Sequence, residues 1–211
     1  MALDTGGPDA ARHWIERAEP THPSLIDVEH VLDALFGVVN VPSGIWIDED
    51  ATIVRPPEPA FPRRSRLAEM PVPDDLDPLL RDMLVESKKI RTEPERYLTA
   101  LRDWVGRGPE SVYALAPDEV VRRSRPRPPE ESLAAAHFTL GQHLHRAGHP
   151  TDAVSHFREA HRLHPGNWTY KRQAWQFVHP FQGPNDVYEG DWLSDVKAVG
   201  AENYYPSLDM P

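Results

Sequence analysis

The sequence predicts an α+β fold that is mostly helical, and three observations support this prediction. Apolar residues recur with helical spacing at 76–105 and again at 133–164. Short runs of β-branched and aromatic residues occur before residue 60, at 45–47 and 52–54. The chain also has 23 prolines, about double the usual content, which cluster at 56–78 and 126–129 and mark candidate linkers.

Composition limits the classes of function. Hydrophobic residues make up 39% of the 211 residues, and no apolar run approaches the ~18 residues of a membrane helix. The formal charge of −10 argues against nucleic-acid binding, which needs a basic face. The Arg-rich stretches 63–66 and 122–125 lie beside prolines and indicate solvated linkers. The start of the chain lacks a signal-peptide pattern, so we expect a cytoplasmic protein without a membrane or nucleic-acid partner.

Cysteine is absent from the chain. Disulfides, thiolate metal sites, Cys nucleophiles and dithiol redox motifs are therefore excluded within it. No triad, phosphate-binding loop or paired-carboxylate pattern occurs either, and Gly6, Gly7 and Gly141 lack the spacing that cradles a nucleotide. The sequence predicts no catalytic residue and no cofactor.

Residues 1–60 alternate short extended pieces with helices. Residues 2–4 indicate the end of a strand, and Pro8 opens a helix whose buried face holds Ala11, Trp14, Ile15 and Ala18. After an extended stretch at 24–26, Asp27 is placed to cap a second helix, which Gly37 ends. Strands at 45–47 and 52–54, joined by a turn at 48–50, complete the segment.

This order resembles the second half of a thioredoxin-like domain of the redoxin type, the thiol-disulfide oxidoreductases related to alkyl hydroperoxide reductase. The matching residues are Leu35-Phe36-Gly37-Val38, Val41-Pro42, Ile45-Trp46-Ile47-Asp48-Glu49-Asp50 and Ile53-Val54. The resemblance implies that Pro42 is a cis-proline and that the backbone beside it pairs with an extended substrate segment. Val41 and Pro42 are therefore candidate peptide-binding residues.

The chain departs from that family where the chemistry lies. The first strand and the Cys-bearing helix have no counterpart, and the missing strand normally lies inside the sheet, so its loss exposes backbone groups on two strands. Three explanations stay open: an internal Met of a longer gene, a half-domain patched by its own helices or a partner, and an accidental resemblance. In the first two cases this polypeptide is redox-inactive, because it has no thiolate.

Residues 61–130 are predicted to hold amphipathic helices and a Pro/Arg-rich linker. The prolines at 56–62 favour an extended exit from the first segment. One helix follows Leu76, and a second follows a capping box of Thr92 and Glu95 and stops at Gly106. We expect these two helices to pack on each other and on the helices of 131–180, with a further short helix from Pro117.

Residues 131–180 are predicted to form a helix pair and a capping helix at 167–177. Gly148 closes the first helix of the pair and Pro150 opens the second. The spacing Leu140-Gly141, Leu144, Ala153, Phe157, Ala160, Pro165 resembles a tetratricopeptide repeat. That resemblance implies a binding scaffold with no chemistry of its own.

The same resemblance implies a concave side, on which Phe138 and Arg146 are the foremost peptide contacts. The full set is Ala135, Phe138, Gln142, His145 and Arg146. A single repeat cannot bury its own faces, so cover comes from the middle helices, the capping helix or a second subunit in a homodimer. If the middle helices fill the groove, nothing is left for a partner.

Seven of the eleven histidines fall between His137 and His164. His145 and His149 are separated by Gly148, which ends the helix before His149, and His161 and His164 have no third ligand at helical spacing. We therefore expect surface histidines and no metal site. Residues 181–211 form an aromatic and acidic tail, which we expect to pack back on the body; the alternative is an exposed docking strip.

Two functions follow. The first is a non-catalytic interaction protein, built from a thioredoxin-like remnant and a helical domain, that binds a protein or peptide. The alternative is the carboxy-terminal portion of a thiol-disulfide oxidoreductase or peroxiredoxin-like enzyme whose cysteines lie upstream of Met1.

Overall fold

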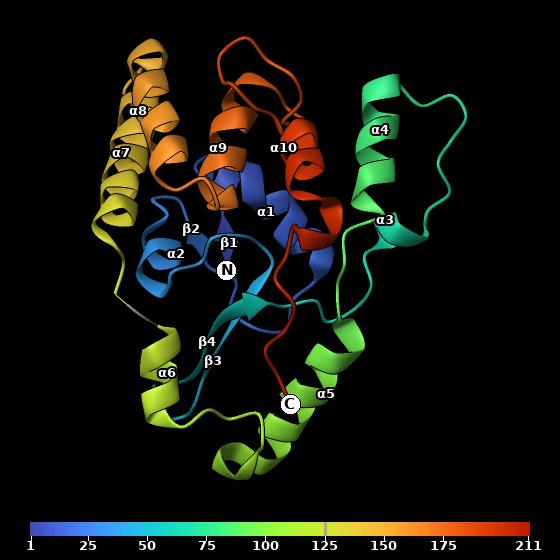
Figure 1. The fold of residues 1–211 in the computed structure, drawn as a ribbon, viewed down its shortest axis with the longest axis vertical. Helices are drawn as coiled ribbons and strands as arrows, with labels where there is room; N and C mark the ends of the chain where they lie inside the picture. Colours follow the sequence, from blue (N-terminus) through green and yellow to red (C-terminus); the bar gives the residue numbers. More distant parts are fainter. Residues whose placement is uncertain (125) are drawn as a thin grey trace. The chain divides into compact units, whose positions relative to one another are not determined.

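The computed structural model describes residues 1–124 and 126–211, and the side chains of these residues except 66 and 67. More than half of the chain is helical and the strands are few, which agrees with the predicted α+β, mostly helical class. Figure 1 shows the elements in order. They are β1 (Ala2–Leu3), α1 (Gly7–Ala18), β2 (Ile26–Asp27), α2 (Val31–Phe36), β3 (Ser43–Ile47), β4 (Ile53–Pro59), α3 (Arg66–Glu69), α4 (Pro78–Ser87), α5 (Pro94–Arg107), a 3-10 turn (Gly108–Glu110), α6 (Pro117–Arg123), α7 (Pro129–Arg146), α8 (Pro150–Leu163), α9 (Trp168–Val178), α10 (Trp192–Val199) and a second 3-10 turn (Ala201–Asn203).

The chain divides into two compact units, each built from two separate stretches. Unit 1 comprises Met1–Val39 and Pro126–Val178, and unit 2 comprises Asn40–Arg125 and His179–Pro211. This division differs from the consecutive segments 1–60, 61–130, 131–180 and 181–211 expected from the sequence. The first segment is split after Val39, because the β3–β4 hairpin buries its side chains against α5 and the tail. Arg125, in the predicted Arg-rich linker, lies outside the described residues.

Unit 1 begins with a parallel pair of very short strands connected through α1. Ala2 pairs with Ile26 and Leu3 with Asp27. Asp27 is not the N-cap residue of α2 as predicted, because the helix begins at Val31 and its N-cap is His30. The Asp27 carboxylate still accepts hydrogen bonds from the amides of Val31 (3.1 Å) and Leu32 (2.7 Å). The predicted buried face of α1 is wrong at Trp14, which is 65% exposed. Gly7 and Ala11 are the buried residues of this helix, because α1 packs on unit 1 through the edge that carries small side chains.

Helices α7 and α8 lie side by side as the two arms of a hairpin (Figure 1). The turn between them contains Gly148, whose φ of +86° favours glycine. Gly141 allows the close approach, since a Cβ there would lie 2.8 Å from Cε1 of Phe157. Helix α9 follows, and the amides of Trp168 and Thr169 donate to the carbonyl of Val39 at 2.7 and 3.2 Å. This joins the two stretches of unit 1.

Unit 2 is organised around the antiparallel β3–β4 hairpin. Ser43 pairs with Pro59 and Ile47 with Ile53, with irregular register on both sides of Trp46. The second strand is longer than its predicted span of 52–54 and continues through three prolines. Proline is tolerated where the strand position needs no donor toward its neighbour, as at edges and bulges.

The core of unit 2 joins the hairpin, α5 and the tail. Its buried members are Trp46, Tyr97, Ala100, Leu208 and Met210. Trp46 stacks on Trp104 at 5.0 Å and donates its indole N–H to the hydroxyl of Tyr97 at 3.3 Å. The last residues of the tail thus lie inside the unit.

A buried arginine holds the tail to the hairpin. Arg55 is 1% exposed and donates twice to the carboxylate of Glu58, at 2.8 and 3.2 Å. Nη1 donates to the carbonyl of Tyr113, and Nη2, which also bonds Glu58, donates to the carbonyl of Asp209, both at 2.7 Å. Burial raises the pKa of Glu58 and the bonds to Arg55 oppose this. A buried charge is tolerated when it is fully paired in this way.

Two predictions about the middle helices need correction. The Thr92–Glu95 capping box does not form: α5 is capped at Glu93 without a side-chain bond to the helix, because the Glu93 carboxylate reaches the tail instead. Gly106 does not stop the helix, which ends one residue later with Gly108 at the C-cap. Helix α4 lies beside α10 and α5 packs on the hairpin. No helix among the described residues has the length and apolarity to cross a membrane.

Candidate functional site

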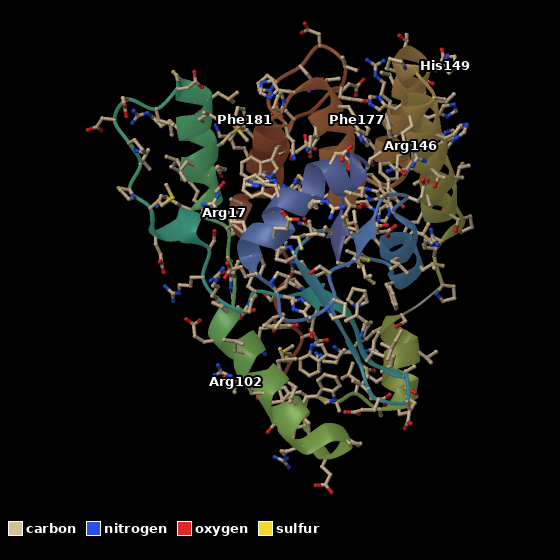
Figure 2. All side chains as sticks on the ribbon, turned by 180° about the vertical axis from the view of Figure 1, so that it is seen from behind. Arg17, Arg102, Arg146, His149, Phe177 and Phe181 are labelled. Carbon is tan, nitrogen blue, oxygen red and sulfur yellow. The ribbon has the colours of Figure 1, made fainter. Side chains whose placement is uncertain are left out.

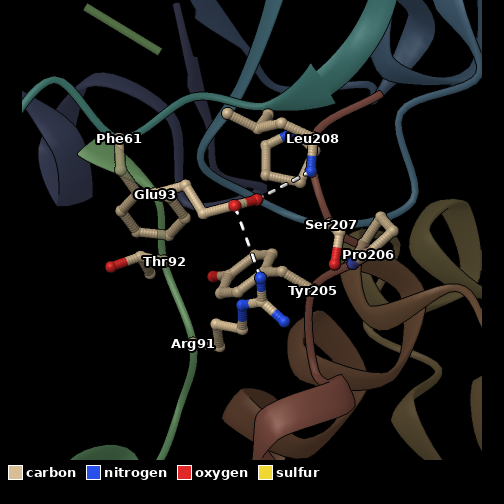
Figure 3. Close-up of a pocket in the computed structure, with 9 residues that line it drawn as sticks. Phe61, Arg91, Thr92, Glu93, Tyr205, Pro206, Ser207 and Leu208 are labelled. Atoms are coloured by element: carbon tan, nitrogen blue, oxygen red, sulfur yellow. Dashed lines mark hydrogen bonds and ion pairs between the residues drawn. The ribbon is translucent and has the colours of Figure 1, made fainter. Parts of the chain in front are cut away.

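A pocket opens in unit 2 where three segments meet (Figure 3): the end of β4, the chain before α5, and the tail. The hollow is shallow: its cavity volume is about 10 Å³, which holds about one water molecule, and the rest of the space is open to solvent. The lining residues are Pro59, Phe61, Arg91, Thr92, Glu93, Tyr205, Pro206, Ser207 and Leu208.

Two aromatic rings form the apolar side of the pocket. Phe61 and Tyr205 meet edge to face, with ring centroids 4.9 Å apart at 78°. The Tyr205 hydroxyl donates to the carbonyl of Val41 at 2.7 Å. Tyr205 therefore connects the pocket to the Val41–Pro42 loop, where the peptide bond is cis as the sequence analysis expects.

The backbone of that loop is bonded within unit 2. The Val41 amide donates to Oδ1 of Asn40 at 2.9 Å, and the Pro42 carbonyl accepts from the amide of Ala60 at 3.3 Å. Asn40 in turn donates to the carbonyl of Tyr204 at 3.3 Å. Both carbonyls of the predicted peptide-pairing residues thus have partners, while the Pro42 ring is exposed. Neither Val41 nor Pro42 is among the residues that line the pocket.

The opposite side of the pocket is charged. The Glu93 carboxylate accepts from the Leu208 amide at 3.0 Å and faces Arg91 and Arg96, each at 3.4 Å. The Leu208 amide, followed by the two arginines, holds the pKa of Glu93 below its usual value, so this carboxylate stays ionised. Arg91 is 61% exposed and presents the cation of the pocket to solvent. The pocket therefore offers two rings, a fixed anion and a cation.

The residues expected on the concave side of α7 contact their own unit. Phe138 is 1% exposed, stacks on Tyr170 at 4.1 Å and meets the His30 ring at 5.2 Å. Gln142 is fully buried and donates to the Thr5 hydroxyl at 2.7 Å.

The outer members of that set are engaged as well. His145 stacks on Phe177 at 3.8 Å, and its burial lowers the pKa of the imidazole. Arg146 pairs with Glu29, and Ala135 is half-buried. The side chains that meet this face come from the N-terminal segment and from α9, which is the predicted capping helix. The capping helix was one of the covers expected from the sequence, and the N-terminal segment was not.

A buried polar pair in unit 1 escaped the sequence analysis. His30 Nδ1 lies 3.1 Å from Oδ2 of Asp33, and the side chains are 3% and 0% exposed. The backbone of His30 is left-handed, with φ 54°. Closed to solvent, the pair connects the start of α2 to the Phe138 ring. Its only sequence signal is the His-x-x-Asp spacing, which is too common to single out.

Comparison of the chain with protein-family models, with curated proteins and with solved structures found no significant match.

Proposed function

We propose that this chain is a non-catalytic interaction protein that binds an extended segment of a protein or peptide in the pocket of unit 2. The observation behind the proposal is a contrast: the pocket between Phe61, Arg91 and Tyr205 is open, while Phe138 and Gln142 on α7 are buried. In this proposal the α7–α8 pair, similar to one tetratricopeptide repeat, is scaffold that its own unit has covered.

The side chains around the pocket favour a ligand of mixed character. The edge-to-face rings of Phe61 and Tyr205 suit proline or an apolar side chain, since aromatic-lined grooves bind such extended segments. The exposed guanidinium of Arg91 suits a carboxylate next to that residue. An extended peptide with an apolar residue beside an acidic one combines both.

The test is selection of peptides from a displayed library on the full chain, followed by fluorescence anisotropy with the selected peptides. Truncating one ring or removing the cation costs contacts typical of an interface anchor, so we expect Phe61→Ala to weaken binding by about tenfold or more, and Arg91→Ala by somewhat less. Arg102→Ala is the matched control, because Arg102 points away from α5 into solvent (Figure 2). Equal binding by the wild type and both pocket variants would refute the proposal.

A second candidate is the carboxy-terminal portion of a thiol-disulfide oxidoreductase. The observation in its favour is that β1–β2 and β3–β4 are two separate two-stranded sheets within the described chain. In the redoxin-like order that the sequence resembles, a further strand, which precedes the Cys-bearing helix, belongs inside the sheet. Reading the DNA upstream of Met1 in frame is the test: an open frame with Cys-x-x-Cys after an apolar strand, and disulfide reduction by the longer product, would support it. An immediate stop codon would remove it.

A further inference from the structure

Two histidines from the two arms of the helical hairpin meet in unit 1. His137 on α7 and His156 on α8 have their Nδ1 atoms 2.9 Å apart, with ring centroids 5.2 Å apart at 33°. Both rings are half-buried and accessible from solvent. A neutral imidazole has one nitrogen that donates and one that accepts, so a single proton joins the two rings and at least one of them presents a lone pair.

We propose that His137 and His156 bind a divalent late transition-metal ion, of which Cu²⁺ and Ni²⁺ are the preferred examples. Metal–imidazole bonds measure roughly 2.0–2.1 Å. Two such bonds at a right angle hold their nitrogens about 2.9 Å apart, the separation found here. Right-angled nitrogen ligands are typical of the tetragonal coordination of Cu²⁺ and Ni²⁺.

When the ion binds, imidazole nitrogens replace water molecules on the metal, and the ring protons are redistributed. The rings pivot so that both Nδ1 lone pairs point at the ion, and two metal–nitrogen bonds replace two metal–water bonds. The ring proton that Nδ1 loses is retained at Nε2 in a neutral imidazole, and any second proton leaves to solvent. Because a metal ligand must be an unprotonated imidazole, protons compete with the ion, and binding weakens as the pH falls.

The remaining coordination positions belong to water and to one nearby carboxylate. In the described part of the chain no three His, Cys, Asp or Glu side chains form a ready metal cluster. Glu159 lies one helical turn after His156, and its carboxylate is bonded to Arg162 at 2.6 and 2.9 Å. That bond is the main cause of its lowered pKa, to which a charged His137 adds. Glu159 can turn from Arg162 to an ion held by the histidines.

The test is calorimetric titration of Ni²⁺ into the full-length chain, without a histidine tag, at neutral pH. We expect one ion per chain and a loss of affinity of more than about tenfold in His137→Ala and in His156→Ala, since even outer-shell changes reach that size. His143→Ala is the matched control, because His143 is an exposed histidine of the same helix and should leave affinity unchanged. At a free Ni²⁺ concentration 100 times the dissociation constant, the midpoint of thermal unfolding should rise by about 5–10 °C.

Circular dichroism shows whether each variant folds, and His137→Gln and His156→Gln replace the alanine variants if they do not. Wild-type affinity in both single variants would overturn the proposal, as would an equal loss in His143→Ala. Ni²⁺ binding that is unchanged between pH 7.5 and pH 5 would also overturn it.

Discussion

The concave side of α7 in unit 1, which the sequence predicts to contact a peptide, and the pocket of unit 2, for which we propose that role, differ in what lies next to them. On α7, Phe138 and Gln142 meet Tyr170, His30 and Thr5 of their own unit. In unit 2, the rings of Phe61 and Tyr205 border an open space. Helical spacing identifies which side chains share a face. Which other part of the chain covers that face depends on contacts more than 100 residues apart in sequence, such as Thr5 with Gln142.

The largest effect that tests this contrast is Phe138→Ala. Because the ring is 1% exposed and packed on Tyr170, we expect its loss to destabilise the protein by about 3–5 kcal/mol, the usual cost for a buried Phe. Leu140→Ala, at a residue that is 42% exposed on the same helix, should cost far less. Urea unfolding measures both. Little change in Phe138→Ala would show that the face is open after all.

Lowering the pH should reduce the free energy of unfolding of unit 1, because His161 is buried there. Burial is the main reason that its pKa is lowered to about 4, against 6.5 in the unfolded chain. Between these values the unfolded chain binds a proton that the folded one does not, so stability falls as the pH drops from about 6.5 to about 4, by up to about 3 kcal/mol. In His161→Gln that part of the pH dependence should disappear from urea midpoints measured between pH 7.5 and pH 4.5. Parallel curves for the two proteins would contradict the assignment.

Replacing a glycine by alanine should lower the stability of unit 1 at Gly141 and raise the stability of unit 2 at Gly106. In Gly141→Ala the new Cβ meets Phe157 at 2.8 Å, and overpacking of about 1–3 kcal/mol outweighs the better helix propensity of alanine. In Gly106→Ala, within α5, nothing lies within 4 Å, so we expect stabilisation of about 0.5–1 kcal/mol. Thermal or urea unfolding distinguishes the pair, and the same sign for both would refute the close approach of α7 and α8.

The smallest expected effect concerns Glu93 in the pocket. The pKa of Glu93 is lowered, chiefly by the hydrogen bond from the Leu208 amide. The ionised carboxylate therefore stabilises unit 2 fully at pH values above the unfolded pKa, near 4.5. This stabilisation is lost as the pH falls through the folded pKa. Glu93→Gln should flatten the acid limb of the stability curve below that pH. The neighbouring Glu95, with a side chain 74% exposed, supplies the control variant Glu95→Gln, which should follow the wild type.

Local chemistry in the sequence predicted several elements closely. Gly148 and Pro150 mark the turn between α7 and α8, because these residues act through backbone conformation at their own positions. The turn at 48–50 likewise separates β3 from β4. The Asp27 carboxylate accepts hydrogen bonds from the first amides of α2, although the N-cap residue of that helix is His30.

Features that depend on distant partners were not predictable in the same way. The pocket needs Phe61 beside Tyr205, and the histidine pair needs His137 beside His156 on another helix. Trp14 shows the converse: it has the spacing of a core residue, but α1 turns its glycine and alanine edge inward. At the start of α5, where a local capping box was expected, the Glu93 carboxylate accepts a hydrogen bond from the Leu208 amide of the tail, at 3.0 Å.

Each unit is built from two separate stretches of the chain, which limits how the protein can be cut into stable fragments. Because the polypeptide enters unit 2 after Val39, returns at Pro126 and leaves again after Val178, neither unit exists as one continuous stretch. Dissecting the gene into consecutive fragments would separate β1 and α1 from α9, or the hairpin from Leu208 and Met210. By contrast, a single proteolytic cut in a segment that connects the two units should leave each unit folded. The two fragments should then dissociate only in denaturant.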